Sequence, residues 1–121
     1  MPKLIESPTI VQAMGSKLKV IKEYVGRENT NTDAVSIAYM ESPVGWAEPG
    51  QAPEFDEYTL VWSGTLMVET KEEVIYVKKG QAIIVNRGEW VRYSTPMEEA
   101  QYISICIPAC AQETVNRDLD E

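Results

Sequence analysis

The chain has 121 residues, of which 19 are Asp or Glu, 11 are Lys or Arg and none is His, so its formal net charge is -8 at pH 7. A chain of this length forms one domain with a substantial core, and its acidic charge without a basic cluster argues against nucleic acid and anionic membranes as partners. No apolar run approaches the roughly 20 residues that cross a bilayer. The N-terminus also lacks a secretory signal, so a soluble, cytoplasmic protein is expected.

Residues 1–33 are predicted to form an irregular N-terminal arm. A Ser-Pro pair before residues 9–14 and a Gly after them favour one or two helical turns there. Residues 18–25 are predicted to form a strand at a sheet edge or in a dimer contact. A polar loop is expected over residues 26–33.

Residues 34–111 alternate short β-rich segments with turn clusters, a pattern typical of an all-β sandwich or barrel. Turns are predicted where Gly, Pro or Asn occurs, including a turn at residues 63–64 between two strands. Residues 112–121 are expected to form a mobile acidic tail. The predicted strands are residues 34–40, 58–62, 65–69, 74–77, 81–85, 90–94 and 100–107.

Two stretches in the middle of the chain follow known motif spacings. Residues 45–64 fit G-x5-H-x-H-x3-E-x6-G, and residues 80–95 fit G-x5-P-x-G-x2-H-x3-N. These are the two motifs of the cupin superfamily, and the chain resembles a single-domain member of it. The resemblance implies a double-stranded β-helix, also called a jelly-roll barrel. The positions that hold the template residue are Gly45, Glu57, Gly64, Gly80 and Gly88.

The departures from the two motifs fall on the metal ligands. The resemblance implies a site of three imidazoles and one carboxylate, but Gln51, Pro53 and Val91 stand at the histidine positions, and only Glu57 keeps the ligand. One carboxylate binds a first-row metal weakly, so neither a metal nor another cofactor is expected. The alternative is an all-oxygen site for calcium or magnesium, made by Glu57 with Asp56, Glu54 or Glu48.

Residues 55–68 and 105–109 are similar to a histidine-poor branch of the superfamily, which includes the cupin domain of the ethanolamine-utilisation accessory protein. The resemblance extends over roughly residues 35–111. It implies the fold more than an activity, because cupins support many kinds of chemistry and binding on one frame.

Strand alternation predicts which side chains enter the barrel. If Glu57 faces the interior, as the resemblance implies, Thr59 and Val61 share its face. In the second motif, Val91 and Tyr93 then also face inward. Glu57 and Tyr93 are therefore the candidate catalytic residues. A structural role, in which Glu57 forms a hydrogen bond with Gln51 or Tyr93, is the alternative, because a buried carboxylate needs a partner.

The candidate ligand-binding residues are Gln51, Trp46 at the rim of the pocket, and Tyr102 and Cys106 in its wall. On the last strand Tyr102, Ser104 and Cys106 share one face, and this polar face is the better candidate for lining the pocket. The result is an aromatic, sparsely polar pocket suited to a small organic ligand. Tyr93 and Tyr102 also have a structural interpretation as core side chains, and Trp46 has one as a residue that covers apolar surface or lies in a dimer contact.

Three functions fit these residues. The first is a cofactor-independent isomerase, epimerase or lyase in which Glu57 transfers a proton and Tyr93 is the opposing group. The second is a module that binds a metabolite without turnover. The third is an accessory or structural protein that acts through a homodimer surface. Nucleophilic catalysis through a Ser-His or Cys-His pair is excluded, because the chain has no histidine.

Two further expectations concern the cysteines and the oligomer. Cys106 and Cys110 are predicted to be free thiols, as is usual in a reducing compartment. A homodimer is expected from the resemblance, because small cupins pair through a sheet face and their N-terminal segments. The apolar side chains available for such a contact in the arm are Leu18, Val20, Ile21, Tyr24 and Val25.

Overall fold

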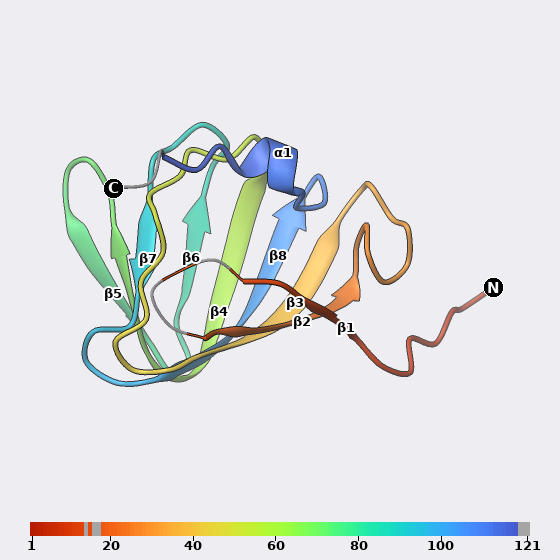
Figure 1. Ribbon diagram of the computed structural model, residues 1–121, viewed down its shortest axis with the longest axis horizontal. Coiled ribbons are helices and arrows are strands. Elements are labelled where there is room, and N and C mark those ends of the chain that lie inside the picture. Colours follow the sequence, from red (N-terminus) through yellow and green to blue (C-terminus); the bar gives the residue numbers. More distant parts are fainter. Residues whose placement is uncertain (14, 16–17, 119–121) are drawn as a thin grey trace.

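The computed structural model describes residues 1–13, 15 and 18–118, and within these ranges it consists of eight strands and one short helix (Figure 1). All strand pairings are antiparallel. This confirms the all-β fold class. The elements are β1 (Thr9–Val11), β2 (Val20–Val25), β3 (Ser36–Ser42), β4 (Asp56–Glu69), β5 (Val74–Lys78), β6 (Ala82–Val85), β7 (Arg92–Ser94), β8 (Ala100–Ile107) and α1 (Gln112–Val115).

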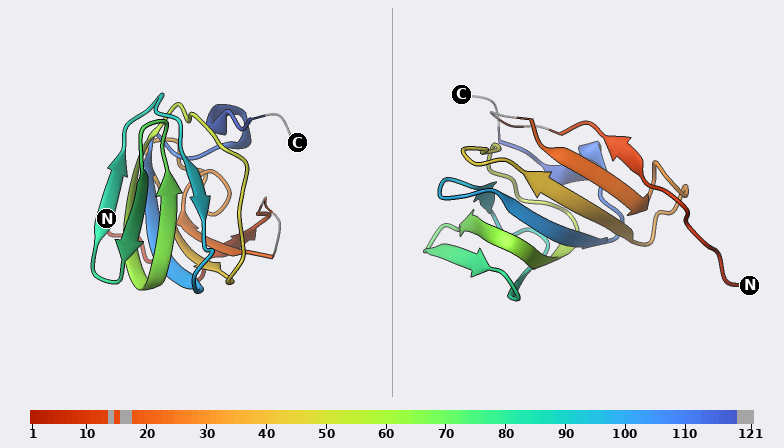
Figure 2. Two further views of the ribbon diagram at one scale, coloured as in Figure 1. Left: turned by 90° about the vertical axis from the view of Figure 1, so that its left-hand side faces the viewer. Right: turned by 90° about the horizontal axis from the view of Figure 1, so that it is seen from below.

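The strands follow the order β1-β2-β3-β8-β4-β5, which is visible from below in Figure 2, and β6 and β7 also pair with β4. Strand β4 is 14 residues long and joins the parts of the barrel. Its first half lies between β8 and β6, and its second half pairs with β5 and β7. The interior of the barrel therefore lies beside this one long strand.

The predicted turn at residues 63–64 is a bend inside β4, and the two strands expected on either side of it are one. The register of β4 against β8 shifts between Val61 and Ser63, as in a β-bulge. Gly64 follows with a φ of 79°, and a Cβ there would lie 1.8 Å from the carbonyl oxygen of Glu99. A bulge and a glycine bend a strand without ending it, which is why local turn chemistry misplaced the break.

Alternation along the strands separates core from surface as predicted. In β8, Tyr102, Ser104 and Cys106 are buried, and the residues between them are more exposed. The same alternation places Thr59 and Val61 of β4 inside the barrel. The main apolar cluster consists of Trp46, Val61, Leu66, Val68, Val77, Val85, Val91, Tyr93, Ala100 and Tyr102.

The predicted helical turns over residues 9–14 are wrong for residues 9–11, which form β1. Thr9 and Val11 pair with Glu23 and Ile21 of β2. Three consecutive β-branched residues, Thr9, Ile10 and Val11, and an available sheet edge outweigh the Ser-Pro signal, since β-branched side chains pack well on a pleated surface. As a result β2 lies inside the sheet and β1 is its edge. Met14, the last residue of the predicted helix, lies outside the described residues.

The predicted mobile tail is also wrong for residues 112–118. Residues 112–115 form α1, which lies over one end of the barrel beside β4 and β8 (Figure 1). Val115 is buried in a small cluster with Phe55 and Cys106. Beyond the helix, the backbone N–H of Asp118 donates to the carbonyl oxygen of Gly50 at 2.7 Å. One apolar anchor and this backbone hydrogen bond hold the segment in place. Residues 119–121 lie outside the described part.

In the described ranges, no helix has the length and apolar character needed to span a bilayer.

Candidate functional site

A cavity of about 80 Å³ lies inside the barrel, and Val115 of α1 and Arg117 beyond this helix are among its lining residues. A second hollow of about 150 Å³ adjoins it, and the two share six lining residues, among them Glu57 and Arg117. Polar residues that line the first cavity come from six parts of the chain: Lys19 before β2, Glu48 and Gln51 in the loop after β3, Glu57 and Thr59 in β4, Tyr93 in β7, Tyr102 in β8 and Arg117 after α1.

Glu57 is held by two hydroxyl groups. Tyr93 Oη donates a hydrogen bond of 3.0 Å to Glu57 Oε1, and Ser104 Oγ donates one of 2.6 Å to Glu57 Oε2. Burial and the neighbouring Glu57 raise the pKa of Tyr93 well above its usual value, so Tyr93 remains a hydroxyl donor. The expected structural bond to Tyr93 is therefore present. Ser104 is a second partner of Glu57. The sequence predicted only that Ser104 lies on the polar face of the last strand.

Lys19 places a positive charge inside the barrel. Its Nζ lies 3.9 Å from Glu48 Oε1 and 4.1 Å from the centroid of the Trp46 ring, and 7% of the side chain is exposed. Burial alone would lower the pKa of Lys19. Tyr102, Glu48 and Glu57 outweigh burial and raise that pKa, which keeps the ammonium group charged.

Glu48 is a second buried carboxyl group. Its backbone N–H donates to the carbonyl oxygen of Tyr93 at 3.3 Å, and this fixes the loop after β3 against β7. Burial raises the pKa of Glu48; Lys19 opposes the increase, and Glu57 adds to it. The cavity therefore holds a carboxyl group that binds its proton more tightly than usual, beside the carboxylate of Glu57.

Gln51 and Arg117 bring polar atoms into the cavity wall without partners. Both main chains are fixed, because Gln51 forms bridges with Val91 and with Arg117. Within the described residues, Gln51 Oε1 and Arg117 Nε are buried and accept or donate no hydrogen bond. Gln51 is 5% exposed. A buried polar atom left unsatisfied costs about 1–3 kcal/mol, so a molecule in the cavity that pairs with these atoms is stabilised.

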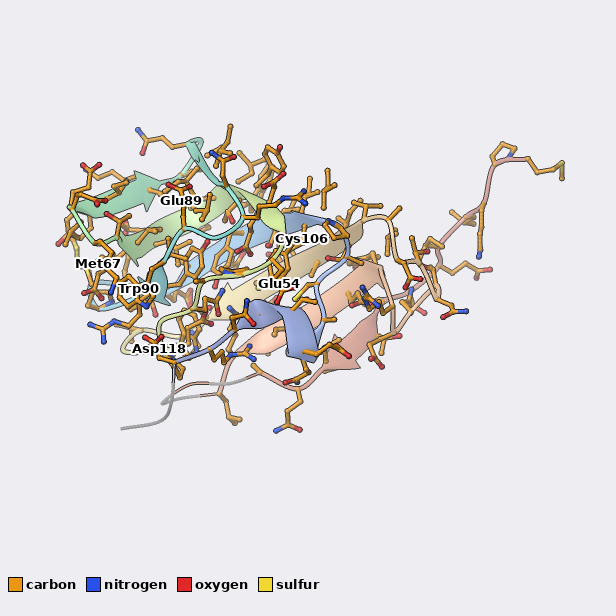
Figure 3. All side chains as sticks on the ribbon, turned by 90° about the horizontal axis from the view of Figure 1, so that it is seen from above. Glu54, Met67, Glu89, Trp90, Cys106 and Asp118 are labelled. Carbon is orange, nitrogen blue, oxygen red and sulfur yellow. The ribbon has the colours of Figure 1, made fainter. Side chains whose placement is uncertain are left out.

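The segment after α1 closes this end of the barrel by contacts with two loops. Trp90 Nε1 donates a hydrogen bond of 2.9 Å to Asp118 Oδ2, and both side chains are labelled in Figure 3. The amide of Asn116 donates to Glu54 at 3.1 Å and to the carbonyl oxygen of Ala52 at 3.0 Å. These contacts place Arg117 against the cavity.

Solved structures share this architecture. A putative ethanolamine utilization protein Q from Salmonella typhimurium is 15% identical with a TM-score of 0.68, over 85% of this chain and 97% of that one. A cupin-like protein from Thermotoga maritima is 14% identical with a TM-score of 0.70, over 93% of each chain. The chain has the cupin fold. The polyketide cyclase RemF from Streptomyces resistomycificus is 16% identical with a TM-score of 0.76, over 100% of this chain and 87% of that one.

A curated protein from Myxococcus xanthus with the name endoribonuclease YbeY is 41% identical to this chain over 103 residues. The match includes 83% of this chain but 34% of that protein. The chain thus spans about a third of the length of this relative. No family model matches the chain.

The residues at the cupin metal positions do not fit a metal. Pro53 and Val91 offer no side-chain donor, and both oxygens of Glu57 already accept hydrogen bonds. The ammonium group of Lys19 in the same cavity would also repel a cation. Within the described ranges, no group of three or more His, Cys, Asp or Glu side chains is placed to hold an ion.

The structure brings most of the predicted site residues together. Glu57, Tyr93, Gln51 and Tyr102 line one cavity. The prediction for Trp46 is wrong, because this residue is 1% exposed in the core and not at the rim. Its ring packs in the apolar cluster, and Lys19 Nζ lies over the face of this ring.

Cys106 belongs to the adjoining hollow, where it lies 3.9 Å from Ser104 Oγ. The Cys110 thiol and burial raise the pKa of Cys106 above its usual range, so Cys106 is a thiol and not a reactive thiolate. Both cysteines are free, as predicted.

Sequence reasoning missed the roles of Lys19, Glu48 and Arg117. Lys19 and Arg117 lie outside the two motifs, near opposite ends of the chain. The one local signal for Lys19 was its place among apolar neighbours, since a lysine between Leu18 and Val20 interrupts an apolar segment. Glu48 was considered only as part of an all-oxygen metal site.

Proposed function

We propose that this cupin binds a small organic molecule in the cavity below α1 and does so without a metal. The observation that carries the proposal is the pair of buried, unpartnered atoms Gln51 Oε1 and Arg117 Nε, which belong to two residues that line one cavity. An empty site would leave both unsatisfied or in contact with water, whereas a ligand with matching groups satisfies both.

Glu57 orients the ligand in this account. Tyr93 and Ser104 hold its carboxylate in one position, and a carboxylate has further lone pairs for a ligand hydroxyl or N–H. Two fixed donors restrict the side chain before the ligand arrives, which lowers the entropy lost on binding.

Proton transfer in the same cavity would give an isomerase or lyase. Tyr93 is a poor partner for this reaction, because its raised pKa keeps the proton on the phenol. The raised pKa of Glu48 favours that residue as the proton carrier opposite Glu57. Two carboxyl groups in different environments are a common arrangement for acid-base work.

A thermal-shift screen of sugars, sugar acids, keto acids and amino alcohols tests the binding proposal. A ligand at a hundred times its dissociation constant stabilises a protein by about 2.7 kcal/mol, which shifts the melting temperature by several degrees. The shift should shrink in Glu57→Gln and persist in Glu72→Gln, an exposed glutamate outside the cavity. A shift of equal size in both variants would place the ligand elsewhere.

A homodimer that acts as an accessory protein is the second candidate. The observation that favours it is an exposed apolar area on the outer face of β4, β6 and β8, formed by Tyr58, Leu60, Trp62, Ile84 and Ile107. This outer face is a better candidate contact than the arm, because Ile21 of the arm lines the cavity. Light scattering should show a dimer that Trp62→Glu dissociates and that Val74→Glu, on β5, leaves intact.

Ribonuclease activity does not transfer to this chain from its relative. RNA binding requires Lys and Arg to displace counterions from phosphates, and this chain carries a net charge of -8. The name of the relative describes a protein of which two thirds lies outside the match.

A further inference from the structure

The charges around the cavity indicate which ligands it accepts. Lys19 and Arg117 contribute two positive charges, and Glu57 contributes one negative charge. Glu48 is already paired with Lys19 at 3.9 Å, and both oxygens of Glu57 accept hydrogen bonds. Lys19 and Arg117 thus bring two cationic groups into one cavity of a protein whose overall charge is -8. A ligand carboxylate meets two cationic partners there, whereas a cationic ligand meets only carboxyl groups that already have partners.

Lys19 provides a positive charge in the same cavity that is lined by residues at the cupin metal-ligand positions. Gln51 and Glu57 stand at two of these positions, and both line the cavity with Lys19. The ammonium group is fixed by Glu48 at 3.9 Å and by the ring of Trp46 at 4.1 Å. A lysine held in this way is a permanent cation whose attraction for an anion is strengthened by the low dielectric of the interior.

The two unpartnered atoms differ in what they require. Gln51 Oε1 can only accept, so its partner must carry a hydroxyl or an N–H. Arg117 Nε can only donate, so its partner must be an acceptor, and a carboxylate is the acceptor that matches a guanidinium group best. The cavity is about 80 Å³ in volume, and a water molecule takes roughly 30 Å³ in the liquid, so the ligand is small.

We propose that the cavity binds a small hydroxycarboxylate, whose carboxylate pairs with Lys19 and Arg117 and whose hydroxyl donates to Gln51. This inference rests on the proposed function, because it names the ligand class of the same site. It assigns to Lys19 the electrostatic task that a bound metal performs in a cupin with histidine ligands.

Four small probe molecules distinguish recognition of the ligand carboxylate from recognition of the ligand hydroxyl. Glycolate carries both a carboxylate and a hydroxyl; acetate lacks the hydroxyl, ethylene glycol lacks the carboxylate, and ethanolamine replaces the carboxylate by a cation. Titrations followed by two-dimensional NMR report on the site directly, through the side-chain signals of Gln51 and the Nε–H of Arg117. We expect glycolate to bind at least about tenfold more tightly than each of the others, the effect of one charge-assisted hydrogen bond.

Two variants test the residues. Gln51→Leu should reduce the affinity for glycolate to that for acetate. Lys19→Met should weaken glycolate binding about tenfold. If the single variant Lys19→Met fails to fold, the double variant Lys19→Met with Glu48→Gln replaces it. The double variant leaves no unpaired carboxylate at residue 48. Lys71→Met is the matched control, because Lys71 also lies over a tryptophan ring, 4.5 Å from the centroid of Trp90, but outside the cavity.

The outcomes are distinct. Preference for glycolate that disappears in the Lys19 and Gln51 variants and remains in Lys71→Met supports the inference. Ethylene glycol or ethanolamine binding as tightly as glycolate would overturn the hydroxycarboxylate and leave a binding cavity for uncharged or cationic molecules. No binding of any of the four probes would also overturn it. The wider thermal-shift screen then decides separately whether the proposed function stands.

Discussion

Lys19 Nζ lies 3.9 Å from Glu48 Oε1 inside the barrel, with 7% and 9% of the two side chains exposed. A buried ion pair contributes little net stability compared with apolar residues of the same size, because both charges must leave water. Neither residue is needed to build the apolar core, which consists of other side chains. The pair is therefore best explained by the cavity that it lines.

Replacement of Lys19 by Met should destabilise the fold. It leaves Glu48 buried without its ionic partner, and loss of one member of a buried pair costs about 3–5 kcal/mol. We expect a value near the lower limit, because Glu48 can take up a proton. Urea unfolding measures the change, and the double variant with Glu48→Gln should recover most of it. A single variant as stable as the parent would show that the pair does not form.

The raised pKa of Glu48 predicts a pH dependence of stability. The ordinary value is 4.5, and the folded protein binds this proton more tightly, so Glu48 contributes stability that is fully present below pH 4.5. That contribution is lost as the pH rises through the higher pKa of the folded state. The free energy of unfolding of the parent should therefore fall relative to Glu48→Gln as the pH rises from 4.5. A constant difference between the two proteins would contradict the shift.

Tyr93→Phe should weaken the site with a moderate loss of stability. The variant removes the donor to Glu57 Oε1, and a hydrogen bond to a charged group contributes about 1.5–3 kcal/mol. Ligand affinity should fall as well, because Ser104 alone then holds the carboxylate. Tyr76→Phe, at an exposed position on β5, is the matched control and should change neither quantity.

Gly64→Ala should be far more damaging than Gly80→Ala. Both glycines have positive φ angles, 79° and 84°, so both substitutions introduce backbone strain of about 1–2 kcal/mol. At Gly64 the new Cβ would also lie 1.8 Å from a carbonyl oxygen, whereas at Gly80 it would meet nothing within 4 Å. Thermal unfolding should show a difference between the two variants, and equal losses would contradict the close approach of β4 to Glu99.

Much of the barrel could be predicted because strand alternation is a local property. The inward set of β8 follows from a period of two, and the positions of Glu57 and Tyr93 follow from motif spacing. The bend at Gly64 could not be separated from a turn, because the sequence does not show that Glu99 approaches from a neighbouring strand.

The rest of the site depends on contacts between distant segments. Lys19 enters the cavity because β2 joins the sheet beside β3, and Arg117 enters because α1 packs over the barrel end. Acidic composition alone favoured a mobile tail, but the burial of Val115 decided the position of this segment. The interrupted apolar segment around Lys19 does not show which cavity its side chain enters, and Arg117 has no local pattern at all.

The most direct test of metal-independent binding is a thermal-shift measurement on protein stripped with a chelator. The account predicts that at least one small molecule raises the melting temperature by several degrees, that the chelator leaves this shift unchanged, and that Gln51→Leu and Glu57→Gln reduce it. Stabilisation that appears only after a divalent transition metal is added back would contradict the account.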